Sequence, residues 1–165
     1  MNEQQEKAYF DAESLKKLIA AEGRTVKTIN CYLWQNSINK NDVVELIDVF
    51  EIVFTDGYKL SLCSNSDNIG MDAIDYNYEA ERKEIEKEHG GKIKVYGVTA
   101  SGTKMWTDVI GLKLQSIQLT KEDLPAGQAG KNYLSDSVVF NFGEEKRVVS
   151  ISPLDGLIID FYEED

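Results

Sequence analysis

His89 is the only histidine of the chain, and so the only imidazole available for proton transfer near neutral pH. It follows a charged segment with helical character, where a protonated imidazole would favour the negative end of the helix dipole. A Ser-His-Asp or Cys-His catalytic set would need this residue, yet the solvated end of a helix offers nothing to fix a nucleophile beside it. The sequence therefore argues against hydrolases of these types, and we assign no catalytic residue.

The two cysteines, Cys31 and Cys63, are separated by 31 residues and both lie in segments with strand-like alternation. With a single histidine they cannot form the ligand spacing of a zinc site, and we expect two reduced, half-buried thiols. Asn65, Asp67 and Gly70 match only three places of a calcium-binding loop, and no glycine-rich phosphate loop is present. We therefore expect no metal and no cofactor.

Two carboxylates, Asp75 and Asp160, each lie between an isoleucine and an aromatic residue. Two carboxylates across a cleft can act as general acid and general base, as in glycoside hydrolysis. The simpler interpretation is that both point outward from strands whose neighbours, Ile74 and Ile159, point inward. A carboxylate enzyme stays an alternative, with Asp75 or Asp160 as its base.

Tyr32 and Trp34 share one face of an alternating segment, opposite Ile29, Cys31 and Leu33. Either that face is covered by another element, or Trp34 is exposed beside Tyr32. Exposed aromatic side chains of this kind are frequent energetic centres of protein interfaces. The pair is therefore a candidate contact site for a partner.

The charge of the chain is strongly negative and unevenly distributed. The net charge is −11, and residues 41–81 hold ten acidic residues and one basic residue, while residues 148–165 hold five acidic residues and no basic one. Such a balance opposes binding to nucleic acid or to anionic lipid, because phosphate binding relies on Lys and Arg. It favours a basic or neutral protein partner, for which Asp72, Asp75 and Asp160 are candidate contacts if the two acidic stretches form one patch.

The first residues are polar and acidic, unlike a secretory signal, and the chain has no apolar run long enough to span a membrane. We therefore expect a cytoplasmic protein without a membrane location.

Periodicity and turn residues predict an α+β fold in one domain, residues 1–165. Helices are expected at about 11–22, capped by Asp11, and at about 78–89, capped by Asn77, with Tyr9 and Phe10 packing at the entry of the first. The strongest hairpin signal is the Asp56-Gly57 turn between alternating segments. Further strands are predicted at 28–34, 71–76, 92–99, 112–119 and in the tail from 137 to 162, with a short helix or turn docking on the core at 103–110.

The tail, 137–162, repeats the outline of 45–77, which predicts two similar three-stranded units. The whole would be a mainly antiparallel sheet of six to nine strands, curled or in two layers.

These features favour a non-catalytic acidic domain that docks a basic or neutral protein, for example an immunity or inhibitor protein. The alternative is a structural or assembly subunit, such as a homo-oligomer in a phage or secretion particle, that uses sheet edges and the 125–130 loop for contacts.

Overall fold

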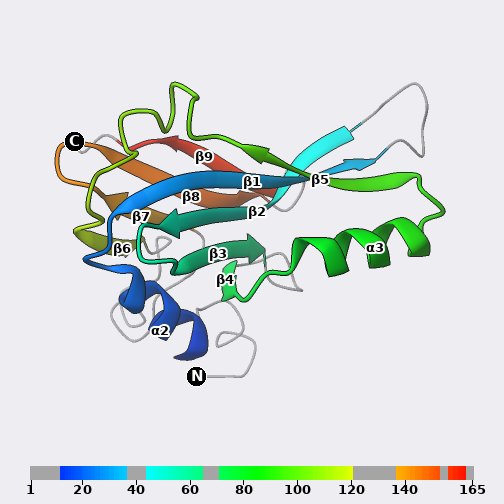
Figure 1. The fold of residues 1–165 in the computed structure, drawn as a ribbon, viewed down its shortest axis with the longest axis horizontal. Helices are drawn as coiled ribbons and strands as arrows, with labels where there is room; N and C mark the ends of the chain where they lie inside the picture. Colours follow the sequence, from blue (N-terminus) through cyan, green and yellow to red (C-terminus); the bar gives the residue numbers. More distant parts are fainter. Residues whose placement is uncertain (1–11, 37–43, 65–70, 121–136, 153–155, 163–165) are drawn as a thin grey trace, which may run out of the picture.

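The computed structural model describes residues 12–36, 44–64, 71–120, 137–152 and 156–162. Within them the chain forms two helices and a strongly curled, mostly antiparallel sheet of nine strands (Figure 1). The predicted α+β class is confirmed. The helices are α2 (Ala12–Ala21) and α3 (Tyr78–Glu88), and the strands are β1 (Val26–Asn36), β2 (Val44–Phe54), β3 (Lys59–Ser64), β4 (Met71–Ile74), β5 (Ile93–Thr99), β6 (Ser116–Thr120), β7 (Ser137–Asn141), β8 (Lys146–Ser152) and β9 (Gly156–Phe161).

Each helix is bounded by a residue that the sequence predicts. α2 stops before Gly23, whose φ of 89° is a conformation that glycine adopts without strain. In α3 the side chain of Asn77 accepts a hydrogen bond from the Ala80 amide at 3.1 Å, which satisfies one of the free donors of the first turn. The predicted cap Asp11 and the aromatic residues Tyr9 and Phe10 lie outside the described residues.

The two stretches that resemble each other each form three consecutive antiparallel strands. β2, β3 and β4 pair in order in the first, and β7, β8 and β9 pair in order in the second. They meet where β2 lies parallel to β9, with Ile47 opposite Gly156. That the two stretches are similar units stays a prediction.

Gly156 is required at this junction. Its φ is 76°, and a Cβ atom at this position would lie 2.5 Å from the carbonyl oxygen of Ile47. No side chain fits between two backbones at that separation. The approach of β9 to β2, and with it the curl of the sheet, therefore depends on a residue without a Cβ.

The curl continues until the far end of the sheet returns to β1. The Val26 amide donates to Leu112 O at 2.9 Å, the Leu114 amide donates to Arg24 O at 2.8 Å, and the Gln115 amide donates to Asn141 O on β7 at 2.8 Å. The predicted strand at 112–119 is thus divided: residues 112–114 pair with the start of β1, and only β6 pairs with β7.

The main core fills the inside of the curl. Phe50, Phe140 and Trp106 are buried there, and the rings of Phe50 and Trp106 stack at 5.1 Å. Trp106 comes from the turn-rich segment 100–111, which is tied to β1 at both ends by the bonds from Ala100 N to Ile29 O and from Gly111 N to Val26 O. The predicted docking of 103–110 on the core is therefore confirmed.

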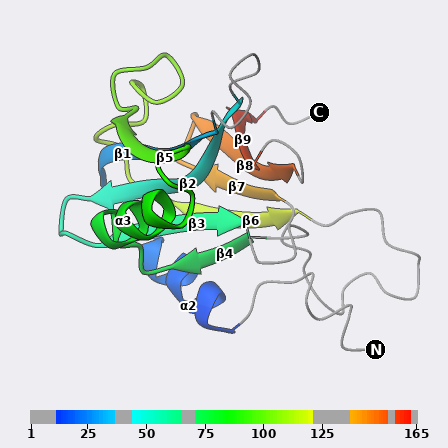
Figure 2. The same cartoon turned by 90° about the vertical axis from the view of Figure 1, so that its right-hand side faces the viewer.

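α3 lies on the other face of β1 and β5, outside the curl (Figure 2). Here a second, smaller core contains Ile85 of α3 with Ile93 and Val95 of β5. Trp34 and Tyr78 pack against it. The side chains described next come from β1, β2, the start of α3 and the short connection between β4 and α3.

Candidate functional site: a tyrosine–carboxylate face

Six side chains gather where the outer face of the sheet meets the start of α3. We call this region the tyrosine–carboxylate face, and it consists of Tyr32, Asp48, Glu51, Tyr76, Tyr78 and Glu81.

The three tyrosine rings are in contact. The ring centroid of Tyr32 lies 4.8 Å from that of Tyr76 and 5.2 Å from that of Tyr78. Gly97, directly opposite Tyr32 in the pairing of β1 with β5, leaves room for this arrangement, because a Cβ there would lie 2.9 Å from the Tyr32 ring. The Tyr78 hydroxyl donates to Val95 O at 3.2 Å, whereas the buried Tyr76 hydroxyl has no hydrogen-bond partner among the described residues.

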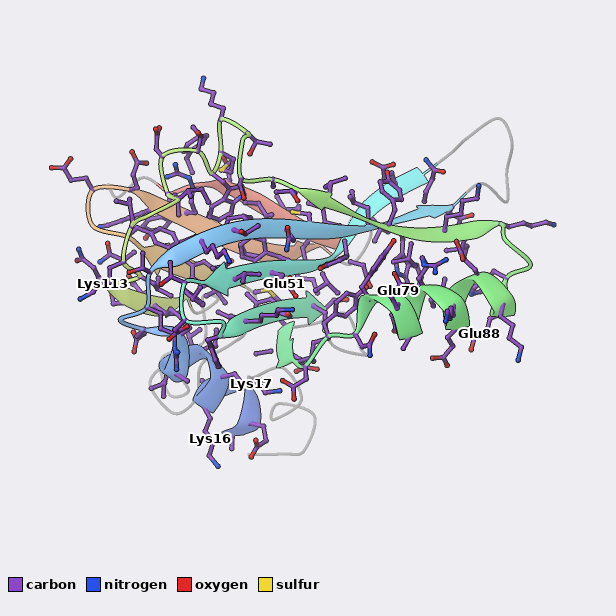
Figure 3. All side chains as sticks on the ribbon, in the orientation of Figure 1. Lys16, Lys17, Glu51, Glu79, Glu88 and Lys113 are labelled. Atoms are coloured by element: carbon purple, nitrogen blue, oxygen red, sulfur yellow. The ribbon has the colours of Figure 1, made fainter. Side chains whose placement is uncertain are left out.

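Glu51 is a buried carboxylate on β2, only 4% exposed (labelled in Figure 3). Its oxygens accept hydrogen bonds from Asn30 Nδ2 at 3.1 Å, Tyr32 Oη at 3.2 Å and Ser61 Oγ at 3.1 Å. All three donors are neutral, and no ion pair within the described part of the chain includes Glu51. Burial together with the Glu51 charge raises the pKa of Tyr32 to about 12, so that this hydroxyl stays a donor.

Asp48 owes its orientation to a β-bulge. In the pairing of β1 with β2, Tyr32 lies opposite Val49 and Leu33 opposite Ile47, so that Asp48 is the extra residue. A bulge redirects a side chain that would otherwise follow the strict alternation of the strand. The Asp48 carboxylate thereby lies close enough to Trp34 and Glu81 to interact with both.

The pKa of Asp48 is raised to about 6, first by burial and then by the negative charge of Glu81. The Trp34 indole opposes this rise, although its Nε1 atom has no hydrogen-bond partner of regular geometry in the described structure. Neither Asp48 nor Glu81 has a basic side chain within ion-pair distance among the described residues. The face therefore carries negative charge that the described chain does not neutralise.

The same field acts on Cys63. Burial raises the pKa of this thiol to about 12, and the carboxylates of Asp72, Asp48 and Glu81 contribute to the rise. Burial alone raises the pKa of Cys31 to about 11. Both cysteines are free, as predicted, and neither is an activated nucleophile, because the reactive form is the thiolate.

The structure places the five predicted contact residues in different surroundings. Tyr32 is central to the face, and Asp72 lies at its border, opposite Cys63 in the pairing of β3 with β4. Trp34 is half-buried because α3 covers its side of the sheet. The sequence left open whether this face is covered or Trp34 is exposed, and the structure shows that it is covered. Asp75 is exposed with its Oδ1 3.4 Å from Lys17 Nζ, and Asp160 is exposed on β9.

Several members of the face were missed by sequence reasoning. Glu51 and Asp48 stand within a strongly apolar strand, and an acidic residue in such a strand is the signal that could have drawn attention to them. Tyr76, Tyr78 and Glu81 lie on both sides of the Asn77 cap, and only the fold brings them to Tyr32.

The described part of the chain contains no group of three or more His, Cys, Asp or Glu side chains arranged to hold a metal ion. Nor does any helix in it combine the length and apolar character needed to cross a membrane. What the face offers chemically is negative charge next to aromatic rings, a combination that attracts cations.

Comparison with protein-family models, with curated proteins and with solved structures gave no match.

Proposed function

We propose that this protein is a non-catalytic binding domain that docks a basic protein partner on the tyrosine–carboxylate face. The observation that carries the proposal is Asp48, a half-buried carboxylate that interacts with Glu81 and has no basic side chain within ion-pair distance among the described residues. A like-charged pair of this kind lowers stability, and residues that lower stability are frequently kept for function.

The neighbouring groups suit a Lys or Arg side chain of the partner. Tyrosine rings attract cations through their electron-rich faces, and the effect grows when water is excluded. The Tyr32 ring contacts the rings of Tyr76 and Tyr78, and Asp48 and Glu81 next to them would supply the charge. An ammonium or guanidinium group docked here would receive both interactions, and it would neutralise negative charge that no described basic side chain pairs with.

The net charge of −11 adds a long-range contribution, since it accelerates encounter with basic proteins and disfavours acidic ones. An immunity or inhibitor protein that blocks a basic enzyme is one form that this function can take. The sequence analysis predicts that the acidic stretches 41–81 and 148–165 form one patch. Asp160 is the one acidic residue of 148–165 within the described ranges, and it lies on β9, outside the face, so the proposed docking surface does not include it.

The test compares matched charge variants. Tagged wild-type protein, the double variant Asp48→Asn with Glu81→Gln, and the control Asp108→Asn with Glu144→Gln are used to capture partners from native lysate, with quantitative mass spectrometry. Both controls are exposed residues outside the face, and both double variants change the net charge equally.

We expect a basic protein that wild type and control retain equally, that the face variant loses, and that high salt releases, because screening weakens exposed charge pairs. Equal retention of the same proteins by all three forms would contradict the proposal. Recovery of the protein itself as a salt-insensitive oligomer would instead favour the assembly alternative.

A further inference from the structure

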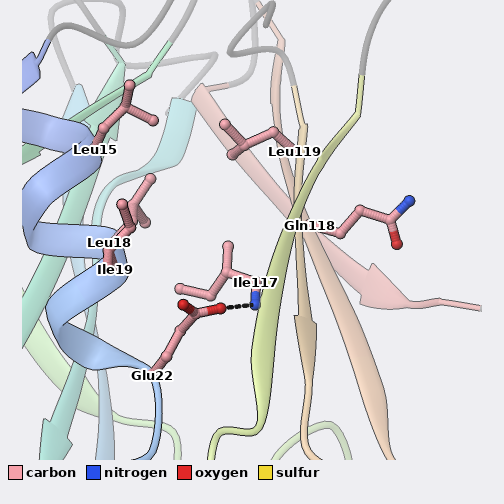
Figure 4. A pocket seen from close by; sticks show the side chains of 7 residues that line it. All are labelled: Leu15, Leu18, Ile19, Glu22, Ile117, Gln118 and Leu119. Carbon is pink, nitrogen blue, oxygen red and sulfur yellow. Dashed lines mark hydrogen bonds between the residues drawn. The ribbon is translucent and has the colours of Figure 1, made fainter.

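The two helices are attached to the sheet in different ways, and α2 is the firmly attached one. Its Leu18 is buried in the main core. The Ser14 hydroxyl accepts a hydrogen bond from the Ala73 amide of β4 at 3.0 Å. At the end of the helix, Glu22 Oε2 accepts from the Ile117 amide of β6 at 2.9 Å (dashed in Figure 4). α2 is therefore tied to the main core, to β4 and to β6.

α3 is attached by much less. Ile85 is its one buried side chain, and it lies in the small second core, apart from the main one. Among the described residues, its one side-chain hydrogen bond to the sheet runs from the Tyr78 hydroxyl to Val95 O at 3.2 Å. The two ion pairs of Arg82 stay within the helix. Segments with so few buried apolar contacts and bonds open locally at a lower free energy than the whole protein unfolds.

Two carboxylates interact across the interface between α3 and the sheet. Asp48 belongs to β2, and Glu81 belongs to the first turn of α3. Burial, and after it the negative charge of Glu81, raises the pKa of Asp48 to about 6. Undocking of α3 would separate the two carboxylates and admit water to Asp48. An ionised Asp48 therefore favours the undocked helix, and a protonated Asp48 favours the docked one.

The groups that share this field with Asp48 are carboxylates, phenols, an indole and a thiol. In the described chain they are Tyr32 and Trp34 of β1, Glu51 of β2, Cys63 of β3, Asp72 of β4, and Tyr76, Tyr78 and Glu81 around the start of α3. Burial raises the pKa of Tyr32 and of Cys63 to about 12, and it raises the pKa of Tyr76 as well, so these three stay protonated between pH 5 and pH 8. Asp48 is the member of this set with a raised pKa inside that range.

We propose that α3 is a lid, which undocks while α2 and the main core stay folded, and that ionisation of Asp48 favours the open form. Opening uncovers the half-buried Trp34 and the second core beneath the helix. Because Tyr78 and Glu81 belong to α3, the closed form is the one that presents the complete tyrosine–carboxylate face. The lid is a property of the free domain, so its test needs no partner, and its failure would leave the proposed function untouched.

The experiment is amide hydrogen exchange of the full chain at pH 5 and pH 8, corrected for the pH dependence of intrinsic exchange. The background is His89→Gln, because a protonated imidazole at the end of α3 would also stabilise the helix at low pH. An undocked helix of 11 residues loses its protection, since isolated helices of this length are marginal. We expect α3 amides to exchange through a smaller opening than amides of α2 and β2. Their opening constant should rise by up to ~10-fold from pH 5 to pH 8, because the pKa of Asp48 returns from about 6 toward its ordinary 3.8 on opening.

Three variants in the same background complete the test. Asp48→Asn should abolish the rise with pH, and Glu81→Gln should lower the opening constant of α3 at pH 8. The matched control Glu84→Gln removes an equal charge from an exposed position of α3 that does not act on Asp48, and it should keep the rise. Three results would overturn the proposal: α3 amides that exchange only together with those of β2, an opening constant that is equal at both pH values, or a control that behaves like Asp48→Asn.

Discussion

Replacing Asp48 by Asn should stabilise the protein at neutral pH. The carboxylate is half-buried beside Glu81, and its pKa is about 6 in the folded chain against an ordinary value of 3.8. Between these two values the folded protein binds the proton more tightly than the unfolded chain, so this group's contribution to stability falls as the pH rises through 6. The difference corresponds to up to ~3 kcal/mol above both values. An amide of the same shape avoids that loss.

The measurement is urea unfolding of wild type and of Asp48→Asn at about pH 8 and about pH 4.5. At the higher pH the variant should be more stable by up to ~3 kcal/mol, and by the lower pH this advantage should shrink by ~2 kcal/mol. Asp108→Asn, an exposed position in the 100–111 segment, removes an equal charge and serves as control. A difference between variant and wild type that is zero, or that does not change with pH, would refute the reasoning about Asp48.

Two further predictions concern the junction of the sheet and the thiols. Gly156→Ala should lower the free energy of unfolding by at least ~2 kcal/mol more than Gly111→Ala. Both glycines have positive φ, but only at Gly156 would the new Cβ meet a backbone oxygen, that of Ile47. Equal effects of the two variants in chemical denaturation would show that the junction can relax. Cys31 and Cys63 should resist alkylation at about pH 8 in the folded protein and react in urea, since burial keeps both thiols protonated; rapid labelling of native protein would contradict this.

The sequence predicted the elements whose signals are local. The Asp56-Gly57 turn joins β2 and β3 as expected, with Gly57 at a φ of 91°, and Asn77 caps α3. Each of these depends on residues within a few positions of one another. Local chemistry decides them before tertiary contacts do.

What the sequence did not predict depends on long-range contacts. The division of the 112–119 segment follows from its pairing with β1, almost 90 residues earlier in the chain, and no periodicity carries that information. The parallel contact of β9 with β2 is of the same kind, although Gly156 gave a hint of close backbone approach.

The candidate site was predicted in part, and the reason lies in one extra residue. Strict alternation along β2 places Asp48 on the side opposite Val49 and Glu51, away from Tyr32. The bulge opposite Tyr32 and Leu33 overrides that pattern. A single-residue shift in register changes which face a side chain occupies, and sequence alternation alone cannot show where it occurs.

The same bulge connects the energetics of the face with its proposed use. Glu51 accepts hydrogen bonds from three neutral donors, whereas Asp48, three residues earlier at the bulge, has no such set among the described residues and interacts with the negative charge of Glu81. Within the described part of the chain, Glu51 therefore has partners for its oxygens, whereas Asp48 has no basic side chain within ion-pair distance. A cation from a partner would lower the pKa of Asp48 toward its ordinary value, so binding at a pH near 6 should release a proton. Stability lost by the free domain would in this way return as affinity in the complex.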